Sequence, residues 1–503
     1  MAEAAVTYRE VLEVREYRYL FVAWGLSLAG DQMAKIALSF LVFDDTRSTG
    51  LAAAAFAISY APWVIGGPLL SALADRLPRR AVMVFCDVVR AVLIAAMVAP
   101  GLPPAALIGM LFVAGLFRPP FQTARSALLP DILDGDRYVA GTALDGIVYQ
   151  LCTVGGFAGG GVLVAALTAR GALGFDAVTF AVSGLLIYTC VASRPAAAVG
   201  DRRQRGFAAG AAVVFGDRSL RAYVLLFWLA SGFMYASEGL AAPLSRLYGG
   251  GPRTGGLIVA AAPFGMSVAS AVLPRLVAPS VRSRLIVPLA AFGCAALVVV
   301  WFRPPLWGVL CLLCAAGVGS TFSTLLNPLF GRAVPAAYRG RAFGVAVAGV
   351  SATQGLAQIL AGVIAAHRAA TSVIGVSGVA GVLAVLAVAV IWPRHGIRVG
   401  PAESAGPVRS SGPAGFTGSS GPSGPAGPTG SSGPSGPSGP AGPAGFTGSS
   451  GSSGPAGFNG SSGSDGAAGS DGAAGSGAGA PSAGHGQPGS GGTAPDSSPG
   501  PSR

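Results

Sequence analysis

Charged residues are scarce in this chain of 503 residues, in which they make up 11%. A typical soluble domain carries roughly 25%, so a soluble globular protein is excluded. Histidine occurs three times, at His367, His395 and His485, which argues against a histidine-based metal enzyme. The sequence also lacks the G-x-x-x-x-G-K-[ST] loop that binds nucleotide phosphates. We therefore expect no enzymatic activity, no metal and no cofactor.

Cysteines are few and offer little chemistry. All six lie inside apolar runs, and the Cys311-x-x-Cys314 spacing has no second pair and no nearby histidine. We interpret them as small apolar residues of buried helices.

Large apolar residues are nearly absent after residue 400, where there is no Leu, Ile, Met, Trp or Tyr. Glycine instead recurs at every third position from Gly412 to Gly475, within Gly-x-y repeats that cover 412–477. This is the collagen pattern, since only glycine fits the axis of a triple helix. Proline never fills the third position and charges are sparse, so we favour a disordered cytoplasmic tail over 393–503, with a trimeric triple helix as the alternative.

The remainder of the chain is strongly apolar. Hydrophobic residues make up 52% of the sequence, and the mean hydropathy is +0.61. A helix needs about 20 mainly apolar residues to cross a lipid bilayer, and twelve such stretches are present. The sequence therefore predicts an all-α membrane protein with twelve transmembrane helices, at 19–43, 50–74, 81–100, 104–127, 139–168, 171–192, 222–246, 254–278, 285–302, 306–329, 342–366 and 370–392.

Basic residues fall mostly into alternate connections. With the N-terminus inside, 24 of them lie on the cytoplasmic side, counting Arg118 and Arg125, and six lie on the opposite side. Because cytoplasmic loops are enriched in Lys and Arg, we expect a multi-pass protein of the cell membrane with both termini in the cytoplasm. The net charge of +12 then suits an anionic membrane surface, and we expect no nucleic-acid partner.

The longest internal loop divides the apolar body into equal halves. We predict a cytoplasmic N-terminus at 1–18, a six-helix bundle at 19–192, a linker at 193–221, a second six-helix bundle at 222–392 and the tail at 393–503. Such paired halves are typical of transporters, with a substrate route between them. We expect the protein to act as a monomer.

The loop between the second and third spans reads S-A-L-A-D-R-L-P-R-R from Ser71 to Arg80. It resembles the signature loop of the major facilitator superfamily, G-x-L-a-D-R-x-G-R-R, with Ser71 and Pro78 in place of two glycines. An acid at a helix end can pair with an arginine or with the positive N-terminus of a neighbouring helix. The alternative is a basic loop with a chance acid. The resemblance predicts a conformational latch that breaks and re-forms, made of Asp75, Arg76, Arg79 and Arg80.

Other motifs are similar to the bacterial drug-efflux branch of that superfamily, which is related to macrolide and siderophore exporters. They are Gly30-Asp31-Gln32, Asp87-Val-Val-Arg90, the segment 119–130 in the loop after span four, the opening of span six at 176–180, and 339–344 in the loop before span eleven. The resemblance implies a secondary active transporter that exports a hydrophobic small molecule, such as a drug, antibiotic or siderophore, by alternating access.

Three alternatives remain open: an importer, a facilitator, or a non-transporting scaffold that uses the tail. The glycine run 155–161 is similar to the antiporter motif G-P-x-x-G-G, but Phe157 replaces its proline. Close helix packing explains these glycines equally well.

Ionisable residues inside predicted spans are functional candidates, because inserting one costs about 2.5–3.5 kcal/mol. Asp87 and Arg90 lie three residues apart and share a helix face, so they can neutralise each other. Asp31 and Lys35, four apart, can do the same. Asp176 begins the sixth span, where it can cap the helix.

Glu238 differs because it has no basic residue at i±3 or i±4. A carboxyl group in that position can carry a proton, which is the coupling ion expected where no ATP site is present. We therefore predict Glu238 as the proton carrier and Asp31 as a substrate or structural contact.

Overall fold

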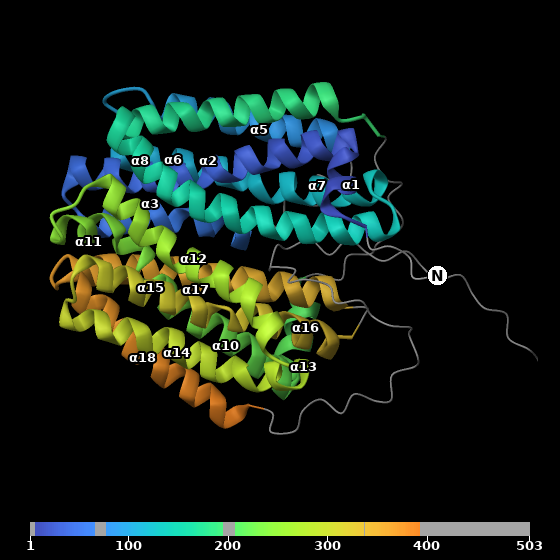
Figure 1. Ribbon diagram of the computed structural model, residues 1–503. Helices are drawn as coiled ribbons and strands as arrows, with labels where there is room; N and C mark the ends of the chain where they lie inside the picture. The colour runs from blue at the N-terminus through green and yellow to red at the C-terminus, as the bar shows by residue number, and fades with distance from the viewer. Residues whose placement is uncertain (1–5, 66–76, 195–206, 336–337, 393–503) are drawn as a thin grey trace, which may run out of the picture. The chain divides into compact units, whose positions relative to one another are not determined.

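The computed structural model describes residues 6–65, 77–194, 207–335 and 338–392. Within these ranges the chain forms helices and no β-strand. The described residues lie in one compact unit, and Figure 1 shows its helices packed side by side.

The first half begins with a short helix that is held by a capping box between Thr7 and Glu10. Further helical elements follow it, and the described residues 61–65 are helical as well. In chain order, the elements of this half are α1 (Tyr8–Glu13), α2 (Arg15–Thr46), α3 (Thr49–Ala57), η1 (Ile58–Tyr60), α5 (Arg79–Ala96), α6 (Pro104–Leu116), α7 (Arg118–Ile132) and α8 (Gly135–Cys190).

The second half follows residues 195–206, which lie outside the described ranges. Its elements are α9 (Phe207–Gly216), α10 (Arg218–Tyr235), η2 (Glu238–Leu240), α11 (Ala241–Leu247), α12 (Pro252–Leu276), α13 (Pro279–Arg282), η3 (Ser283–Leu285), α14 (Ile286–Val299), η4 (Val300–Phe302), α15 (Leu306–Ser320), α16 (Phe322–Ala333), α17 (Arg339–Ala365) and α18 (Ala370–Ile391).

Nine helical segments of the described residues are long and apolar enough to cross a membrane. One of them, α8, turns at Thr168, whose φ of 72° and ψ of 166° are not helical, so it contains both predicted spans 139–168 and 171–192. The 18-residue α5 and the shorter apolar stretch Thr49–Ile65 coincide with the third and second predicted spans. The prediction of an all-α membrane protein with twelve spans in two six-helix bundles is thereby confirmed.

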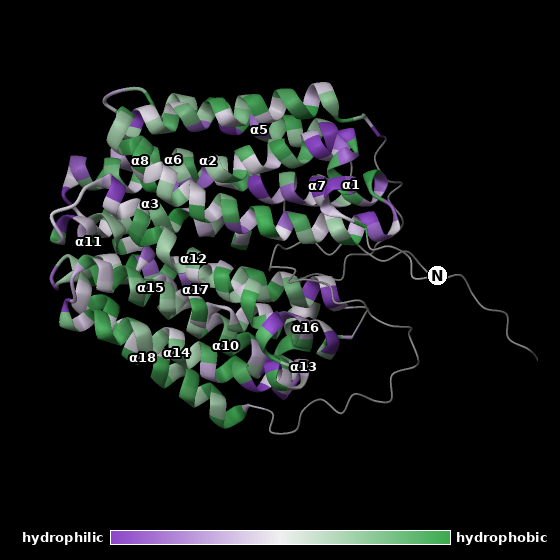
Figure 2. Ribbon diagram, in the orientation of Figure 1, coloured by the Kyte–Doolittle hydropathy of each residue, from purple (hydrophilic) through white to green (hydrophobic). Residues whose placement is uncertain are grey.

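The surface of the described part matches this assignment. Many large apolar side chains on the outer helix faces are exposed, including Phe85, Leu185 and Val390, as expected for residues that face lipid. Figure 2 shows hydrophilic residues gathered toward the ends of the helices, with apolar residues along their length.

The first described helix, the start of the linker and the end of the last described helix lie at one end of the helices. Glu16 accepts hydrogen bonds from Ala192 N at 2.9 Å and from Arg194. Tyr223, near the start of α10, packs on Trp392, with ring centroids 5.1 Å apart. We call this the linker end, and the other end, which carries α11, the opposite end. The predicted linker 193–221 includes helix α9 and the first residues of α10.

Two predicted loops are wrong. Residues 119–130 belong to helix α7, and residues 339–344 open helix α17. In the first case the chain turns at Phe117 and resumes a helix at once, with prolines at its first positions, where a missing N–H costs nothing. The domain boundaries remain predictions, and the predicted tail 393–503 lies outside the described residues.

Candidate functional site: a central cavity between the bundles

The two halves touch closely near the opposite end. Gly161 of α8 faces Gly256 of α12, and a Cβ on Gly161 would lie 2.9 Å from the Gly256 Cα. Thr49 donates a hydrogen bond of 2.9 Å to Gly362 O, and Arg246 pairs with Asp44 at 2.8 Å. Together these contacts close the space between the bundles at that end.

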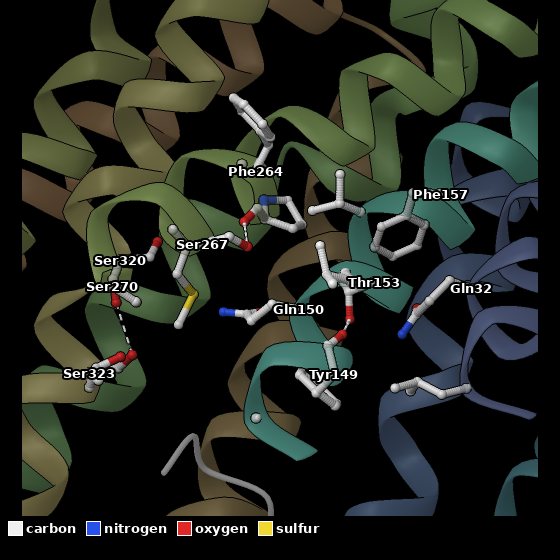
Figure 3. Close-up of a pocket in the computed structure, with 18 of the residues that line it drawn as sticks. Gln32, Tyr149, Gln150, Thr153, Phe157, Phe264, Ser267, Ser270, Ser320 and Ser323 are labelled. Carbon is white, nitrogen blue, oxygen red and sulfur yellow. Dashed lines mark hydrogen bonds between the residues drawn. The ribbon is translucent and has the colours of Figure 1, made fainter. Parts of the chain in front are cut away.

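Toward the linker end, the same two halves enclose a cavity of about 1060 Å³. Its walls come from both bundles, and they extend to Tyr8 of α1 and Arg275 near the end of α12. In Figure 3, Gln32, Thr153 and Phe157 lie on one side of this space, and Ser267 and Ser320 lie on the other. A space of this size, lined mainly by apolar groups with a few polar ones, is typical of a small-molecule site.

Asp31 lies on the first-half wall of the cavity and is held by two arginines from other helices. It forms an ion pair with Arg90 of α5 and a second one, at 3.5 Å, with Arg118 of α7. Arg90 is 3% exposed; it also donates to Ser27 Oγ at 3.2 Å, and its guanidinium lies 4.0 Å from the centre of the Phe180 ring. The predicted pairing of Asp31 with Lys35 is therefore replaced by pairing across helices.

Two further carboxylates lie behind this pair. Asp87 is fully buried, accepts a hydrogen bond of 2.6 Å from Ser183 and lies 3.8 Å from Arg90. The predicted Asp87–Arg90 contact is thus present, but it is longer than the pair with Asp31. Asp176 is also buried and accepts a hydrogen bond from Thr179 at 3.1 Å. It lies well inside α8, eight positions after Thr168, so the prediction that it caps a helix is wrong.

Glu238 is the first residue of the 3-10 turn η2, which follows α10, at the closed side of the cavity. Its carboxylate accepts a hydrogen bond of 2.8 Å from Tyr60 of the first half and one of 3.4 Å from Gln358 of α17. The absence of a cation on its own helix is therefore balanced by neutral donors from two other elements.

Lys35 is the one lysine of the chain and lines the cavity one turn after Asp31. Its ammonium lies 5.3 Å from the centre of the Tyr60 ring and 5.9 Å from that of Phe157. Among the described residues no ion pair within 4.0 Å includes Lys35. It lies on the same helix as Asp31 and over the ring of Tyr60, which donates to Glu238, so it lies between the two predicted acidic sites.

Of the predicted latch, Asp75 and Arg76 lie outside the described residues. Arg79 forms an ion pair with Asp131 at the end of α7, and Arg80 lies 4.8 Å from the centre of the Tyr188 ring. Both contacts stay within the first half, at the linker end.

Sequence reasoning placed Arg118 and Arg125 in a cytoplasmic loop, and so missed that Arg118 is half-buried and Arg125 buried between the helices. Arg125 is 2% exposed and pairs with Asp145 at 2.6 Å, while its guanidinium lies 4.0 Å from the centre of the Trp24 ring. The available signal was their position inside the predicted span 104–127, where a charge needs a partner. Nothing local in the sequence indicated Tyr60 or Gln358 as partners of Glu238.

The glycine run of α8 provides close contacts. A Cβ on Gly156 would lie 2.8 Å from Ala29 O, and one on Gly160 would lie 2.9 Å from Met33 Cα, so α2 packs directly on the α8 backbone. Phe157 is buried and stacks on Phe56, with centroids 5.9 Å apart. These contacts account for the run by helix packing.

Comparison with known proteins agrees with this architecture. The profile of the Major Facilitator Superfamily matches residues 20–328. A comparison with curated proteins gives no match.

Solved structures share the fold at low sequence identity. The nucleoside transporter NupG is 13% identical, with a TM-score of 0.60, and the match covers 76% of this chain and 100% of that one. A peptide transporter POT in complex with sulfate is also 13% identical, with a TM-score of 0.60 and coverage of 77% and 96%. The human organic anion transporter MFSD10 (TETRAN) is 18% identical, with a TM-score of 0.54 and coverage of 75% and 99%.

Two helical bundles around a cavity that is closed at one end are the architecture of a multi-pass membrane transporter. With more than half of its length matched, the chain belongs to the Major Facilitator Superfamily.

Proposed function

We propose that this protein is a secondary active transporter that exports hydrophobic small molecules in exchange for protons. The observation that carries the proposal is the place of Glu238. Its carboxylate joins the two bundles through Tyr60 at the closed side of the cavity. Protonation of such a group changes a contact that has to break when the bundles exchange their open and closed ends.

The cavity supports a small organic substrate. Its lining includes aromatic and aliphatic side chains such as Trp24, Phe121 and Phe264 beside a small number of charged groups. Nucleoside, peptide and organic anion transporters share the fold, so the fold alone leaves the substrate class open. The export direction and the drug, antibiotic or siderophore class rest on the motif resemblance of Asp31, Arg90 and the segments around them.

A transport assay tests the proposal. The full chain is reconstituted in liposomes with the neutral dye Nile red, and a pH gradient of either sign is imposed. We expect the dye to accumulate against its own gradient only when protons flow in the opposite direction, and a protonophore to abolish accumulation. Movement that only dissipates the dye gradient would identify a facilitator, and accumulation in the direction of proton flow would identify an importer.

Deletion of the tail distinguishes a transporter from the scaffold alternative. A variant that lacks residues 401–503 is expected to transport at the rate of the full chain, since the cavity lies within the described residues before the tail. Loss of transport in that variant alone would assign the tail a part in transport, and absence of transport by the full chain as well would count for the scaffold. A drug-susceptibility panel in an efflux-deficient bacterial host then narrows the substrate.

We also propose that the linker end faces the cytoplasm of a cell membrane, so that the cavity loads from inside. Reporter fusions at Arg203 and at residue 430 are both expected to read cytoplasmic, because the basic residues concentrate on that side. A periplasmic signal from either fusion contradicts this topology.

A further inference from the structure

One wall of the cavity is lined by neutral hydroxyl and amide groups from the second half. Ser267 and Ser270 of α12, Ser320 of α15, and Ser323 and Asn327 of α16 all line the space. Figure 3 shows the four serines together on one side, facing Gln150 across the cavity. The charged lining residues lie elsewhere: four belong to α2, α5 and α7, Glu238 lies in η2, and Arg275 lies near the end of α12.

Three of these hydroxyl groups already donate a hydrogen bond to a backbone carbonyl of their own or a neighbouring helix. Ser267 Oγ donates to Pro263 O at 2.6 Å, Ser320 Oγ to Ala316 O at 3.1 Å, and Ser323 Oγ to Ser320 O at 2.8 Å. A hydroxyl group has one hydrogen but two lone pairs. Each of these oxygens can therefore still accept a hydrogen bond, but has no hydrogen left to donate.

Two further oxygens have no partner among the described residues. Ser270 Oγ and Asn327 Oδ1 are buried atoms without a hydrogen bond, and Ser270 as a whole is 9% exposed. Leaving such an atom unpaired costs about 1–3 kcal/mol, so this wall gains from a group that brings hydrogens to it.

The charge of the cavity decides between the two kinds of donor that a substrate can bring, ammonium and hydroxyl. Of the residues that line the space, the acids are Asp31 and Glu238, and neither lies among the serines. A cation bound at this wall would leave water without a carboxylate partner, which is costly. A neutral hydroxyl group does not carry this cost.

We infer that the serine wall, formed by Ser267, Ser270, Ser320, Ser323 and Asn327, is a subsite for a neutral polyhydroxylated group, such as a polyol or a glycosyl unit. The rest of the substrate lies on the apolar part of the cavity. The inference rests on the proposed function, since it takes the cavity as the substrate site, and it narrows the substrate class.

Binding measurements on the full chain in lipid nanodiscs test the inference without transport. The probes are phenyl β-D-glucoside, its permethylated analogue, in which every hydroxyl group is an ether, and phenethylamine as a cationic donor. We expect phenyl β-D-glucoside to bind at least ten-fold more tightly than either of the others. Equal binding of the permethylated analogue, tighter binding of phenethylamine, or no binding of the glucoside overturns the inference.

Variants then locate the subsite. Ser270→Ala is expected to weaken glucoside binding about five-fold, while Ser270→Thr, which keeps the hydroxyl group, stays within two-fold of the wild type. Ser377→Ala is the control, because Ser377 Oγ also donates to a backbone carbonyl, that of Phe233 at 2.8 Å, but lies outside the cavity lining. An unchanged affinity in Ser270→Ala places the glucoside elsewhere and overturns the inference.

The two proposals fail separately. Hydroxyl-dependent binding without proton-driven dye transport would contradict the proposed function but support the polyhydroxyl subsite. Proton-driven dye transport without glucoside binding would contradict the subsite but support the proposed function.

Discussion

Tyr60 and Glu238 lie 178 residues apart in the sequence and are joined by a hydrogen bond of 2.8 Å between the two bundles. Lys35 lies over the ring of the same tyrosine, at 5.3 Å from its centre. A cation from α2, a phenol from η1 and a carboxylate from η2 thus meet where the cavity ends. The contact is part of the closed side, so under the proposed mechanism it would break and re-form each time that the bundles alternate.

Asp31 and its two partners, Arg90 and Arg118, predict that removing the Asp31 charge lowers the free energy of unfolding substantially. Asp31→Asn leaves Arg118 without an ion-pair partner among the described residues, and leaves the buried Arg90 with only the longer contact to Asp87. Breaking a buried pair on one side costs roughly 3 kcal/mol, which thermal or denaturant unfolding in detergent would detect.

Asp44→Asn provides the matched control. It breaks the ion pair with Arg246, in which the two side chains are 43% and 41% exposed, and such surface pairs contribute about 0–1 kcal/mol. The double variant Asp31→Asn/Arg118→Gln is expected to regain part of the lost stability. If the two single variants unfold alike, the cluster does not stabilise the bundle.

The contact between Gly161 and Gly256 predicts a steric block. Gly161→Ala places a methyl group against Pro252 O and the Gly256 backbone, and overpacking of this kind costs about 1–3 kcal/mol. That cost falls on the state in which the opposite end is closed. We expect the initial rate of dye transport to fall about ten-fold at equal protein levels.

Gly109→Ala is the control for this prediction, because a Cβ on Gly109 of α6 meets nothing within 4 Å and Gly109 lies outside the lining of the central cavity. Its transport rate should stay within two-fold of the wild type. If Gly161→Ala transports as fast as Gly109→Ala, the backbones do not need this close approach.

The latch prediction extends to a residue that the signature loop does not contain. Asp75→Asn keeps the shape of the side chain and removes its charge, and we expect normal expression with transport slowed several-fold. Asp131→Asn, which removes the partner of Arg79 at the linker end, should slow transport in the same way. Asp134→Asn, an exposed acid three residues further along, should have no effect. Normal rates in the first two variants would mean that the motif is only a basic loop.

The fold could be predicted from the sequence because the bilayer imposes a length on each apolar run. As far as the structure describes them, the twelve runs lie in helices, and the turn in α8 is at Thr168, the last residue of the fifth predicted span. The errors arose where polar residues were taken to mark a loop. In 119–130 the arginines are inside a helix, and Arg125 is neutralised by Asp145 of α8.

The candidate site was harder to predict from the sequence, because its ion pairs and hydrogen bonds join residues of different helices. The i, i+4 rule assigned Lys35 to Asp31, whereas the partners of Asp31 come from α5 and α7. A search along the sequence identified Glu238 correctly as lacking a neighbouring cation. It could not identify Tyr60 or Gln358, because helix packing alone brings them to the carboxylate.

The last prediction concerns coupling. Glu238→Gln removes the charge of the carboxyl group and keeps its size, so it imitates a permanently protonated state. Since Tyr60 and Gln358 can still hydrogen-bond to a glutamine oxygen, we expect the bundle contact and the binding of the glucoside probe to persist. Proton-driven accumulation of Nile red is expected to fall to the level of empty liposomes. Asp45→Asn, in which an exposed acid at the opposite end is changed, controls for loss of negative charge. Full accumulation by Glu238→Gln would remove Glu238 from the coupling step. Lost probe binding with retained proton movement would make Glu238 a substrate contact, and would leave Asp31 as the acid to test next.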